Sequence, residues 1–317
     1  MKVVIPSSYP GEVPSFDGVD VVVVPHREPV PEEHLDAEVL VAWRQPTPII
    51  EDAARRMGRL KLVQGLAAGP DNVVAAGFAD DVTITSGVGL HNVTVAEHAL
   101  ALSLALVRFL PLAMERQRER KWDHYLGGAV AERGDDGRVV SLRGARVTVW
   151  GFGSIASALA PLLAALGAEV TGVARSAGER HGFPVVTEDD IDGVLAETDL
   201  LIMILPSGEA TAKALNADRL AALKDGALLV NVGRGTTVDE EASLAALQSG
   251  RLAAAALDVT AVEPLPAESP LWEQPNVLIT PHIASDRPQG ASEFLGEQLR
   301  ALAAGEPLRN VLRGPGE

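Results

Sequence analysis

The sequence predicts an α/β protein made of two parallel-sheet domains. Short β-branched apolar runs alternate with helical stretches, and most runs lack a polar face, as strands covered by helices on both sides do. The alternation is interrupted once, by a long apolar helix over residues 95–107, before a second series of strands begins at Val147. The chain has 317 residues, of which 47% are hydrophobic, so it can supply two separate cores.

The expected strands fall into two series on either side of this helix. The first series is Val3–Ile5, Val21–Val24, Val39–Ala42, Leu62–Gln64 and Val82–Thr85. The second series is Val147–Trp150, Val170–Val173, Leu200–Ile204, Leu228–Asn231, Ala254–Asp258 and Val277–Thr280. Strands that alternate with helices in this way indicate layered α/β domains.

Helix signals mark the segments between and after the two series. Thr94 is expected to cap the helix over 95–107, with Glu97 completing a capping box. A charged helix is expected over 114–121, beyond Pro111, and then an exposed arm over 127–138. The tail over 291–304 is predicted to be a helix that Gly305 and Pro307 stop.

Composition excludes several classes of partner. The net charge of −16 argues against binding to nucleic acid or to an anionic membrane, because both need a basic patch. The chain has no cysteine, which removes disulfides, thiolate catalysis and cysteine metal sites. The longest apolar run, Ala99–Val107, is shorter than the roughly 18 residues of a membrane span, and the N-terminus lacks a signal-peptide pattern. A cytoplasmic protein is the expectation.

A glycine-rich turn follows the first strand of the second series. The segment Gly151-Phe152-Gly153-Ser154-Ile155-Ala156 has the Gly-x-Gly-x-x-Ala spacing of a dinucleotide-binding turn and opens a helix. Gly151 allows the tight turn, Gly153 lets the backbone approach a pyrophosphate, and Ala156 fits the close contact between helix and strand. The free N–H groups of the helix then face the phosphates.

The next strand ends at Ala174-Arg175-Ser176, where an NAD-binding site would carry an acidic residue for the ribose 2′-hydroxyl. An arginine fork suits the additional phosphate of NADP instead. We therefore expect NADP, with NAD as the alternative if Arg175 is only a solvated side chain.

Three further motifs complete a pattern that resembles the D-isomer-specific 2-hydroxyacid dehydrogenase family. They are Asn231-Val232-Gly233-Arg234-Gly235, the segment from Asp258 to Pro266 containing Glu263-Pro264, and Thr280-Pro281-His282-Ile283-Ala284. Val95-Ala96-Glu97 and the Leu142-x-Gly144 segment are also similar. The resemblance covers nearly the whole chain.

The resemblance implies a catalytic set of His282, Glu263 and Arg234, and the chemistry needs these residue types. Reduction of a 2-keto acid requires a proton at the carbonyl oxygen, which an imidazole such as His282 can supply near neutral pH. Glu263 can orient that ring and favour its protonated form. Arg234 can hold the substrate carboxylate with two parallel hydrogen bonds.

The resemblance also implies the remaining contacts. Leu205, Pro206 and Val232 are expected along the cofactor, and Asp258 near the nicotinamide carboxamide. The loop containing Ala68 and Gly69 is expected to bind the substrate carboxylate, and Trp43 and Arg44 to border the substrate pocket. The other histidines, including His91 and His98, have no evident set of partners, so no metal is expected.

These expectations give one functional hypothesis and two rivals. A substrate-binding domain (residues 1–92 plus 287–317) and a dinucleotide-binding domain (93–286), Rossmann-like or flavodoxin-like, would face a common cleft. The chain would reduce a small 2-keto acid such as glyoxylate or hydroxypyruvate with NADPH, and the resemblance implies a homodimer. The rivals are a dinucleotide-sensing binding protein and a related dehydrogenase for another small anion. Glu263 argues mildly against a one-carbon substrate.

Overall fold

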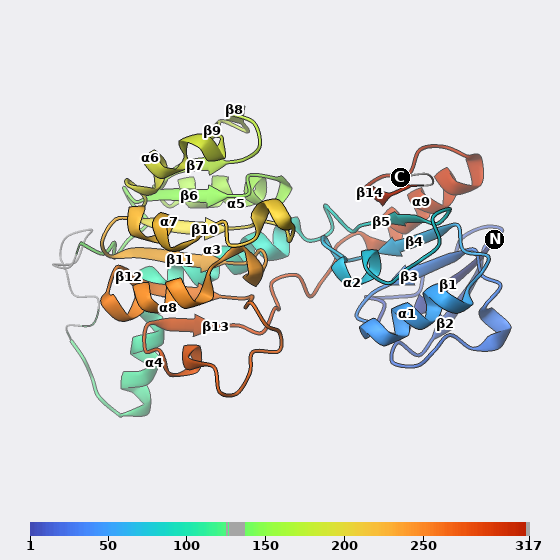
Figure 1. Cartoon of the computed structure of the whole chain (residues 1–317), viewed down its shortest axis with the longest axis horizontal. Helices are drawn as coiled ribbons and strands as arrows, with labels where there is room; N and C mark the ends of the chain where they lie inside the picture. The colour runs from blue at the N-terminus through green and yellow to red at the C-terminus, as the bar shows by residue number, and fades with distance from the viewer. Residues whose placement is uncertain (125, 127–136, 315–317) are drawn as a thin grey trace. The chain divides into compact units, whose positions relative to one another are not determined.

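The computed structural model describes residues 1–124, 126 and 137–314, and these form two compact units (Figure 1). The first unit contains Met1–His91 together with Ser285–Glu317, and the second contains Asn92–Ala284. The first unit is therefore built from both ends of the chain, with the second inserted between them.

The first unit contains a six-stranded sheet in the order β14-β5-β4-β3-β1-β2. Only the pairing of β14 with β5 is antiparallel. Its elements are β1 (Lys2–Pro6), β2 (Asp20–Val24), β3 (Val39–Ala42), α1 (Thr47–Arg56), β4 (Leu62–Gly65), α2 (Asp71–Val74), β5 (Thr83–Thr85), α9 (Ala291–Ala304) and β14 (Val311–Arg313).

Two cores cover the faces of this sheet, because successive strand residues point to opposite sides. Val4 and Leu40 pack on one face with Ile50 of α1. Val3 and Ile5 pack on the other face with residues of α9 such as Leu295. The strands are thus apolar on both sides, as their sequences indicate.

The second unit contains an eight-stranded sheet in the order β13-β12-β11-β10-β6-β7-β9-β8, stacked from bottom to top in Figure 1. Its strands are β6 (Arg146–Trp150), β7 (Glu169–Val173), β8 (Gly178–Arg180), β9 (Phe183–Val186), β10 (Leu200–Met203), β11 (Ala227–Asn231), β12 (Leu252–Leu257) and β13 (Val277–Ile279). Only β8 is antiparallel to its neighbour. The strand order reverses between β6 and β10, and such switch points are where open α/β sheets bind ligands.

Helices cover both faces of this sheet. They are α3 (Asn92–Val107), α4 (Leu110–Arg118), α5 (Ser154–Ala165), α6 (Ile191–Leu195), α7 (Ala217–Ala222) and α8 (Glu240–Ser249). One core joins α3 and α5 to Val147, Val149 and Ile202. The opposite core joins α6, α7 and α8 to Leu201 and Met203.

The structure corrects some of the expected boundaries. The helix predicted over 95–107 begins at Asn92, so Thr94, the expected cap, lies inside the helix. The following helix begins at Leu110 and includes Pro111 in its first turn, where a missing N–H costs no hydrogen bond. The strands β8, β9 and β14 escaped prediction because they are short and lie at or beside sheet edges. Most of the expected arm over 127–138 lies outside the described residues.

No single helix in the described residues is long and apolar enough to cross a membrane. Helices α3 and α4 pass that test of length and composition only as a pair, which is bent by 64°.

Candidate active site

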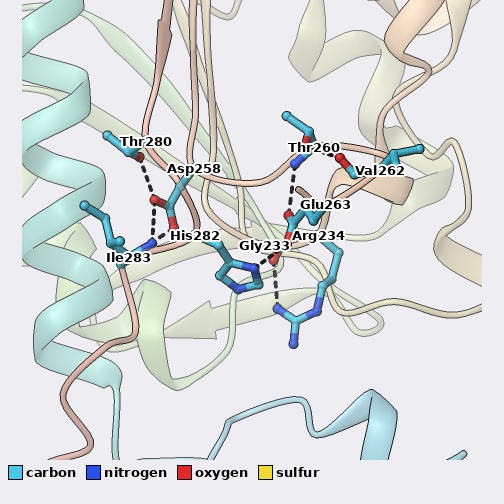
Figure 2. A network of polar contacts seen from close by, with 10 residues as sticks. Gly233, Arg234, Asp258, Thr260, Val262, Glu263, Thr280, His282 and Ile283 are labelled. Atoms are coloured by element: carbon cyan, nitrogen blue, oxygen red, sulfur yellow. Dashed lines mark hydrogen bonds and ion pairs between the residues drawn. The ribbon is translucent and has the colours of Figure 1, made fainter. Parts of the chain in front are cut away.

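Three loops of the second unit carry the residues expected to act in catalysis. Arg234 follows β11, Glu263 lies beyond β12, and His282 follows β13. These strands are parallel neighbours, so their carboxyl ends share one edge of the sheet. Figure 2 shows the three side chains reaching out from these loops.

His282 and Glu263 form a hydrogen-bonded pair. The His282 Nδ1 atom lies 2.7 Å from Glu263 Oε2, and the two side chains are 38% and 37% exposed. The backbone N–H of Thr260 donates to Glu263 Oε1 at 3.1 Å, which fixes the other carboxylate oxygen. Both atoms of the carboxylate are therefore held while the ring remains accessible.

The electrostatics assign the proton within this pair. Burial raises the pKa of Glu263, but the His282 hydrogen bond and ring charge, the Thr260 N–H and the charge on Arg234 outweigh it and leave the pKa below its ordinary value. An ionised carboxylate can only accept, so His282 Nδ1 carries the hydrogen. Nε2 is then the ring atom left to exchange a proton with a substrate.

The loop that carries Arg234 is fixed by the buried side chain of Asn231. Asn231 Oδ1 accepts from the Gly233 N–H at 3.0 Å, and Asn231 Nδ2 donates to the Arg234 carbonyl at 3.1 Å. The same carbonyl accepts from the Thr237 hydroxyl at 2.6 Å. The guanidinium donates to the Gly233 carbonyl at 2.9 Å, as Figure 2 shows. Sequence reasoning missed Asn231, although its position at a strand end directly before a Gly-Arg-Gly turn was a usable signal.

Asp258 is only 2% exposed and binds the chain that follows His282. Its Oδ1 accepts from the Ile283 N–H and its Oδ2 from the Ala284 N–H, each at 3.0 Å. His98, which the sequence left without partners, lies 3.0 Å from the Thr280 hydroxyl and 3.3 Å from Asp258 Oδ1 through its Nε2 atom.

The glycine-rich turn fits the pyrophosphate of a dinucleotide. Gly151 has a φ of +102°, and a Cβ there would lie 2.5 Å from the Ile204 carbonyl oxygen, so only glycine suits this position. Among the described residues nothing lies within 4 Å of the place where a Cβ of Gly153 would be. The backbone is therefore open to a ligand at Gly153, where α5 begins without a side-chain cap from any described residue.

The other residues of this turn have distinct environments. Phe152 is 1% exposed and its ring packs over Gly172, so only its backbone faces the turn. Ala156 is fully buried, as expected for the close contact between helix and strand. Ser154 donates to Asn92 Oδ1 at 2.9 Å, and Ile155 packs against the core.

The loop after β7 contains an arginine contact that the sequence did not reveal. Arg175 and Ser176 are both exposed. Arg180, on β8, donates to the Phe152 carbonyl at 2.8 Å and to the Ser176 hydroxyl at 2.7 Å. This residue joins the glycine-rich turn to the loop after β7. Because β8 was not expected from the sequence, no pattern indicated that Arg180 lies beside the glycine-rich turn.

Two neighbouring strand ends complete this edge of the sheet. A Cβ on Gly233 would lie 2.6 Å from the Leu205 N atom, so the loops after β10 and β11 are in close contact. Leu205 is partly buried, Pro206 is exposed and Val232 is 7% exposed. The three residues expected along the cofactor thus lie beside the glycine-rich turn, because β6, β10 and β11 are adjacent.

The candidate residues of the first unit also follow neighbouring strands. Trp43 and Arg44 come after β3, and the loop containing Ala68 and Gly69 comes after β4. Trp43 is 8% exposed and stacks on His91 with 5.6 Å between ring centroids, whereas Arg44 is exposed and has a φ of +59°. Ala68 and Gly69 are partly exposed.

Metal-ligating residues do not cluster in the described part of the chain, where no group of three or more His, Asp or Glu residues is arranged to hold an ion. The arrangement at the edge of the second sheet consists instead of an acid–base pair, a cation and a dinucleotide turn. Such a set can bind a small anion and move one proton to or from it.

The chain is similar to known dehydrogenases. Residues 100–284 match the family model described as D-isomer specific 2-hydroxyacid dehydrogenase, NAD binding domain. A D-3-phosphoglycerate dehydrogenase of Synechocystis sp. is 29% identical over 87% of this chain and 49% of its own length. The chain thus spans about half the length of the curated relatives that match it first.

Two other relatives match over most of both chains. Glyoxylate/hydroxypyruvate reductase B of Yersinia enterocolitica is 35% identical over 78% of this chain and 77% of its own. The crystal structure of a D-isomer specific 2-hydroxyacid dehydrogenase from Xanthobacter autotrophicus Py2, in complex with NADPH and MES, has a TM-score of 0.77 and 31% identity. That comparison covers 98% of this chain and 97% of the other.

Proposed function

This chain belongs to the D-isomer specific 2-hydroxyacid dehydrogenase family, and we propose that it reduces small 2-keto acids, such as glyoxylate or hydroxypyruvate, with NADPH. The observation that carries the proposal is the 2.7 Å pair of His282 and Glu263, with the charge of Arg234 close enough to lower the pKa of Glu263. A proton donor and a carboxylate-binding cation are the two groups that the reaction asks of the protein.

Each of the three residues has a role in the proposed reaction. The nicotinamide cofactor supplies a hydride to the carbonyl carbon when it is bound. His282 gives the proton on Nε2 to the carbonyl oxygen, and Glu263 stabilises the charged ring before that transfer. Arg234 binds the substrate carboxylate through two N–H groups and offsets the negative charge that develops on the oxygen.

Arg175 and Arg180 support NADPH over NADH. Both follow β7, the strand whose end meets the adenosine ribose in this fold class. Arg180 and Ser176 are joined by a hydrogen bond, and Arg175 is exposed beside them. Two guanidinium groups and a hydroxyl suit an additional phosphate, whereas a ribose hydroxyl is usually met by a carboxylate.

The two units take different parts in this proposal. The second unit binds the cofactor and carries the three catalytic residues, and the first unit supplies the substrate contacts of Trp43, Arg44, Ala68 and Gly69. We also propose a homodimer formed through the second unit. In that unit, the apolar side chains of Leu110, Met114 and Trp122, on or just after α4, are 49%, 53% and 86% exposed, and a second copy would cover them.

The test is the initial rate of NADPH and NADH oxidation with glyoxylate, hydroxypyruvate and pyruvate. D-3-Phosphoglycerate with NADP⁺ and NAD⁺ is included, because some relatives are named D-3-phosphoglycerate dehydrogenase. We expect turnover of a 2-keto acid with NADPH, and a reduced preference for NADPH over NADH in Arg175→Gln and Arg180→Gln. Arg55→Gln, a change to an exposed arginine of α1, is the matched control.

Turnover with NADH alone would overturn the cofactor assignment and keep the reaction. No turnover with any pair, in protein that still binds a dinucleotide, would favour the rival function of a dinucleotide-sensing binding protein.

A further inference from the structure

The polar network behind His282 assigns a role to a residue outside the catalytic set. We propose that His98 is a positioning residue, which acts through Thr280 and Asp258 to hold the backbone of the loop that carries His282. The inference rests on the proposed function only in taking His282 as the proton donor.

Asp258 holds three consecutive backbone N–H groups of this loop. The His282 N–H donates to the Asp258 main-chain carbonyl at 2.8 Å, while the N–H groups of Ile283 and Ala284 donate to the two carboxylate oxygens. Figure 2 shows the contact between Asp258 and Ile283, to the left of the His282 ring. The loop is therefore fixed on both sides of the His282 Cα.

The conformation of His282 explains why such fixing is needed. Its φ is +53°, in the left-handed region that residues with a Cβ adopt at a cost. Residues stay in this region when their surroundings hold them there, and active sites often contain them. The three N–H contacts to Asp258 supply that restraint and thereby fix the direction of the imidazole toward Glu263.

The hydroxyl of Thr280 determines which ring nitrogen of His98 carries a hydrogen. Thr280 Oγ1 lies 2.6 Å from Asp258 Oδ1, and an ionised carboxylate accepts, so the single hydroxyl hydrogen points to Asp258. The contact of 3.0 Å between His98 Nε2 and the same hydroxyl oxygen must then be donated by the ring. His98 is thus a donor at Nε2 to the Thr280 hydroxyl, and Asp258 Oδ1 lies 3.3 Å from the same ring atom.

The donors to this carboxylate, whose side chain is only 1% exposed, are the Thr280 hydroxyl and the N–H groups of Ile283 and Ala284, and His98 holds that hydroxyl in place. A buried carboxylate needs several donors, and losing one of them leaves a poorly compensated charge. His98 lies on α3, which packs on α5 in the core, so its ring offers a rigid donor. Without the ring, the Thr280 hydroxyl is free to turn away from Asp258, and the carboxylate can then shift and release the N–H groups that hold the loop.

A contrasting role for Asp258 was expected from the family resemblance, namely a contact with the nicotinamide carboxamide. The two roles predict different measurements. If Asp258 positions the loop, disturbing it lowers kcat and leaves the affinity for the cofactor unchanged, because the proton donor is misplaced in a site that still binds NADPH. If Asp258 contacts the cofactor, disturbing Asp258 raises the Kd for NADPH.

The test compares His98→Leu with His98→Gln, whose side-chain N–H can take the place of the ring donor. We expect His98→Leu to lower kcat by roughly 10- to 100-fold, the cost of a small misplacement of a reacting group. We expect His98→Gln to recover most of that loss, and both variants to bind NADPH with a Kd within about twofold of the wild type. Thr280→Val and Thr280→Ser form a second pair with the same pattern. His26→Leu, which removes a comparable contact with Ser7 in the first unit, is the control.

Equal losses in His98→Leu and His98→Gln would overturn the proposal, as would a weakened Kd with an unchanged kcat. If the wild-type protein reduces no 2-keto acid, the proposed function fails and the positioning role is measured without turnover. In that case the ¹⁵N resonances of the His282 ring should shift or broaden in His98→Leu and match the wild type in His98→Gln. Unchanged resonances in His98→Leu would overturn the positioning role.

Discussion

In both units the candidate residues follow the ends of strands, but the chemistry and the surroundings of these residues differ. Both sets follow neighbouring strands of a parallel sheet. In the second unit the candidates are ionisable side chains held by buried polar residues, namely Asn231 behind Arg234 and Asp258 behind His282. In the first unit Trp43 is packed into the core, Arg44 is exposed, and the partly exposed residues after β4 are Ala67, Ala68 and Gly69. The comparison suggests that the second unit carries the proton chemistry and the first supplies shape and backbone contacts.

The largest expected effect is the loss of His282. We expect His282→Ala to lower kcat by about 10²- to 10⁴-fold, the usual contribution of a positioned acid or base. The Kd for NADPH should stay near that of the wild type, because the glycine-rich turn is unchanged. Steady-state rates and cofactor titration check both values. A comparable drop in kcat for Trp43→Phe would break the comparison, because the first unit would then share the chemistry.

The replacement of Arg234 by lysine should have the next largest effect. Lysine keeps the charge but cannot make two parallel hydrogen bonds to a carboxylate. We expect Arg234→Lys to lower kcat/KM for the keto acid by about 100-fold, in the range found for removing one stabilising donor. Arg44→Lys, in the first unit, serves as the matched variant. A larger loss in Arg44→Lys would place the principal carboxylate contact in the first unit.

A pair of glycine substitutions would sharpen the assignment of the cofactor site. Gly153→Ala adds a Cβ where no described residue lies within 4 Å, so we expect an unchanged melting temperature and a Kd for NADPH raised by about tenfold. Gly151→Ala places its Cβ 2.5 Å from the Ile204 carbonyl oxygen and should also lower the melting temperature. Thermal unfolding and cofactor titration distinguish them. Unchanged NADPH affinity in Gly153→Ala would argue against a pyrophosphate at this turn.

The smallest expected effect concerns the stability of the first unit as a function of pH. Burial lowers the pKa of His91 from 6.5, although its hydrogen bond to the Leu66 carbonyl and the charge of Asp286 act in the opposite direction. The folded protein therefore keeps the ring neutral at a pH where the unfolded chain binds a proton. Keeping His91 neutral costs no free energy of unfolding above about pH 6.5. Below that pH the unfolded chain binds a proton that the folded protein does not, so the free energy of unfolding declines as the pH falls toward the lowered pKa.

Hydrogen exchange of the β3 and β4 amides measures this dependence in the first unit. Between pH 7.5 and 5.5, the free energy of opening should fall more in the wild type than in His91→Gln, after correction for the intrinsic exchange rate. Equal slopes would show that the titration of His91 does not contribute to the stability of the first unit.

Local patterns predicted most of the strands and the position of the glycine-rich turn. β3 and α9 have the expected bounds, because Val39–Ala42 is a compact apolar run and Gly305 ends the final helix. The expected start of α3 was wrong, because the helix begins three residues ahead of Val95 and none of these residues is buried, so no apolar pattern marks the first turn. The pattern also missed β8, whose three residues carry no apolar period.

The sequence by itself determined the α/β class, most of the strands and the candidate residues that follow them, because periodicity and turn chemistry are local properties. Only the tertiary structure decided which side chains share an environment. His98 and Thr280 are 182 positions apart, and the Arg180 guanidinium meets the Phe152 carbonyl 28 positions away. Such contacts depend on the order in which strands pair and on how helices pack over them, which no local pattern specifies.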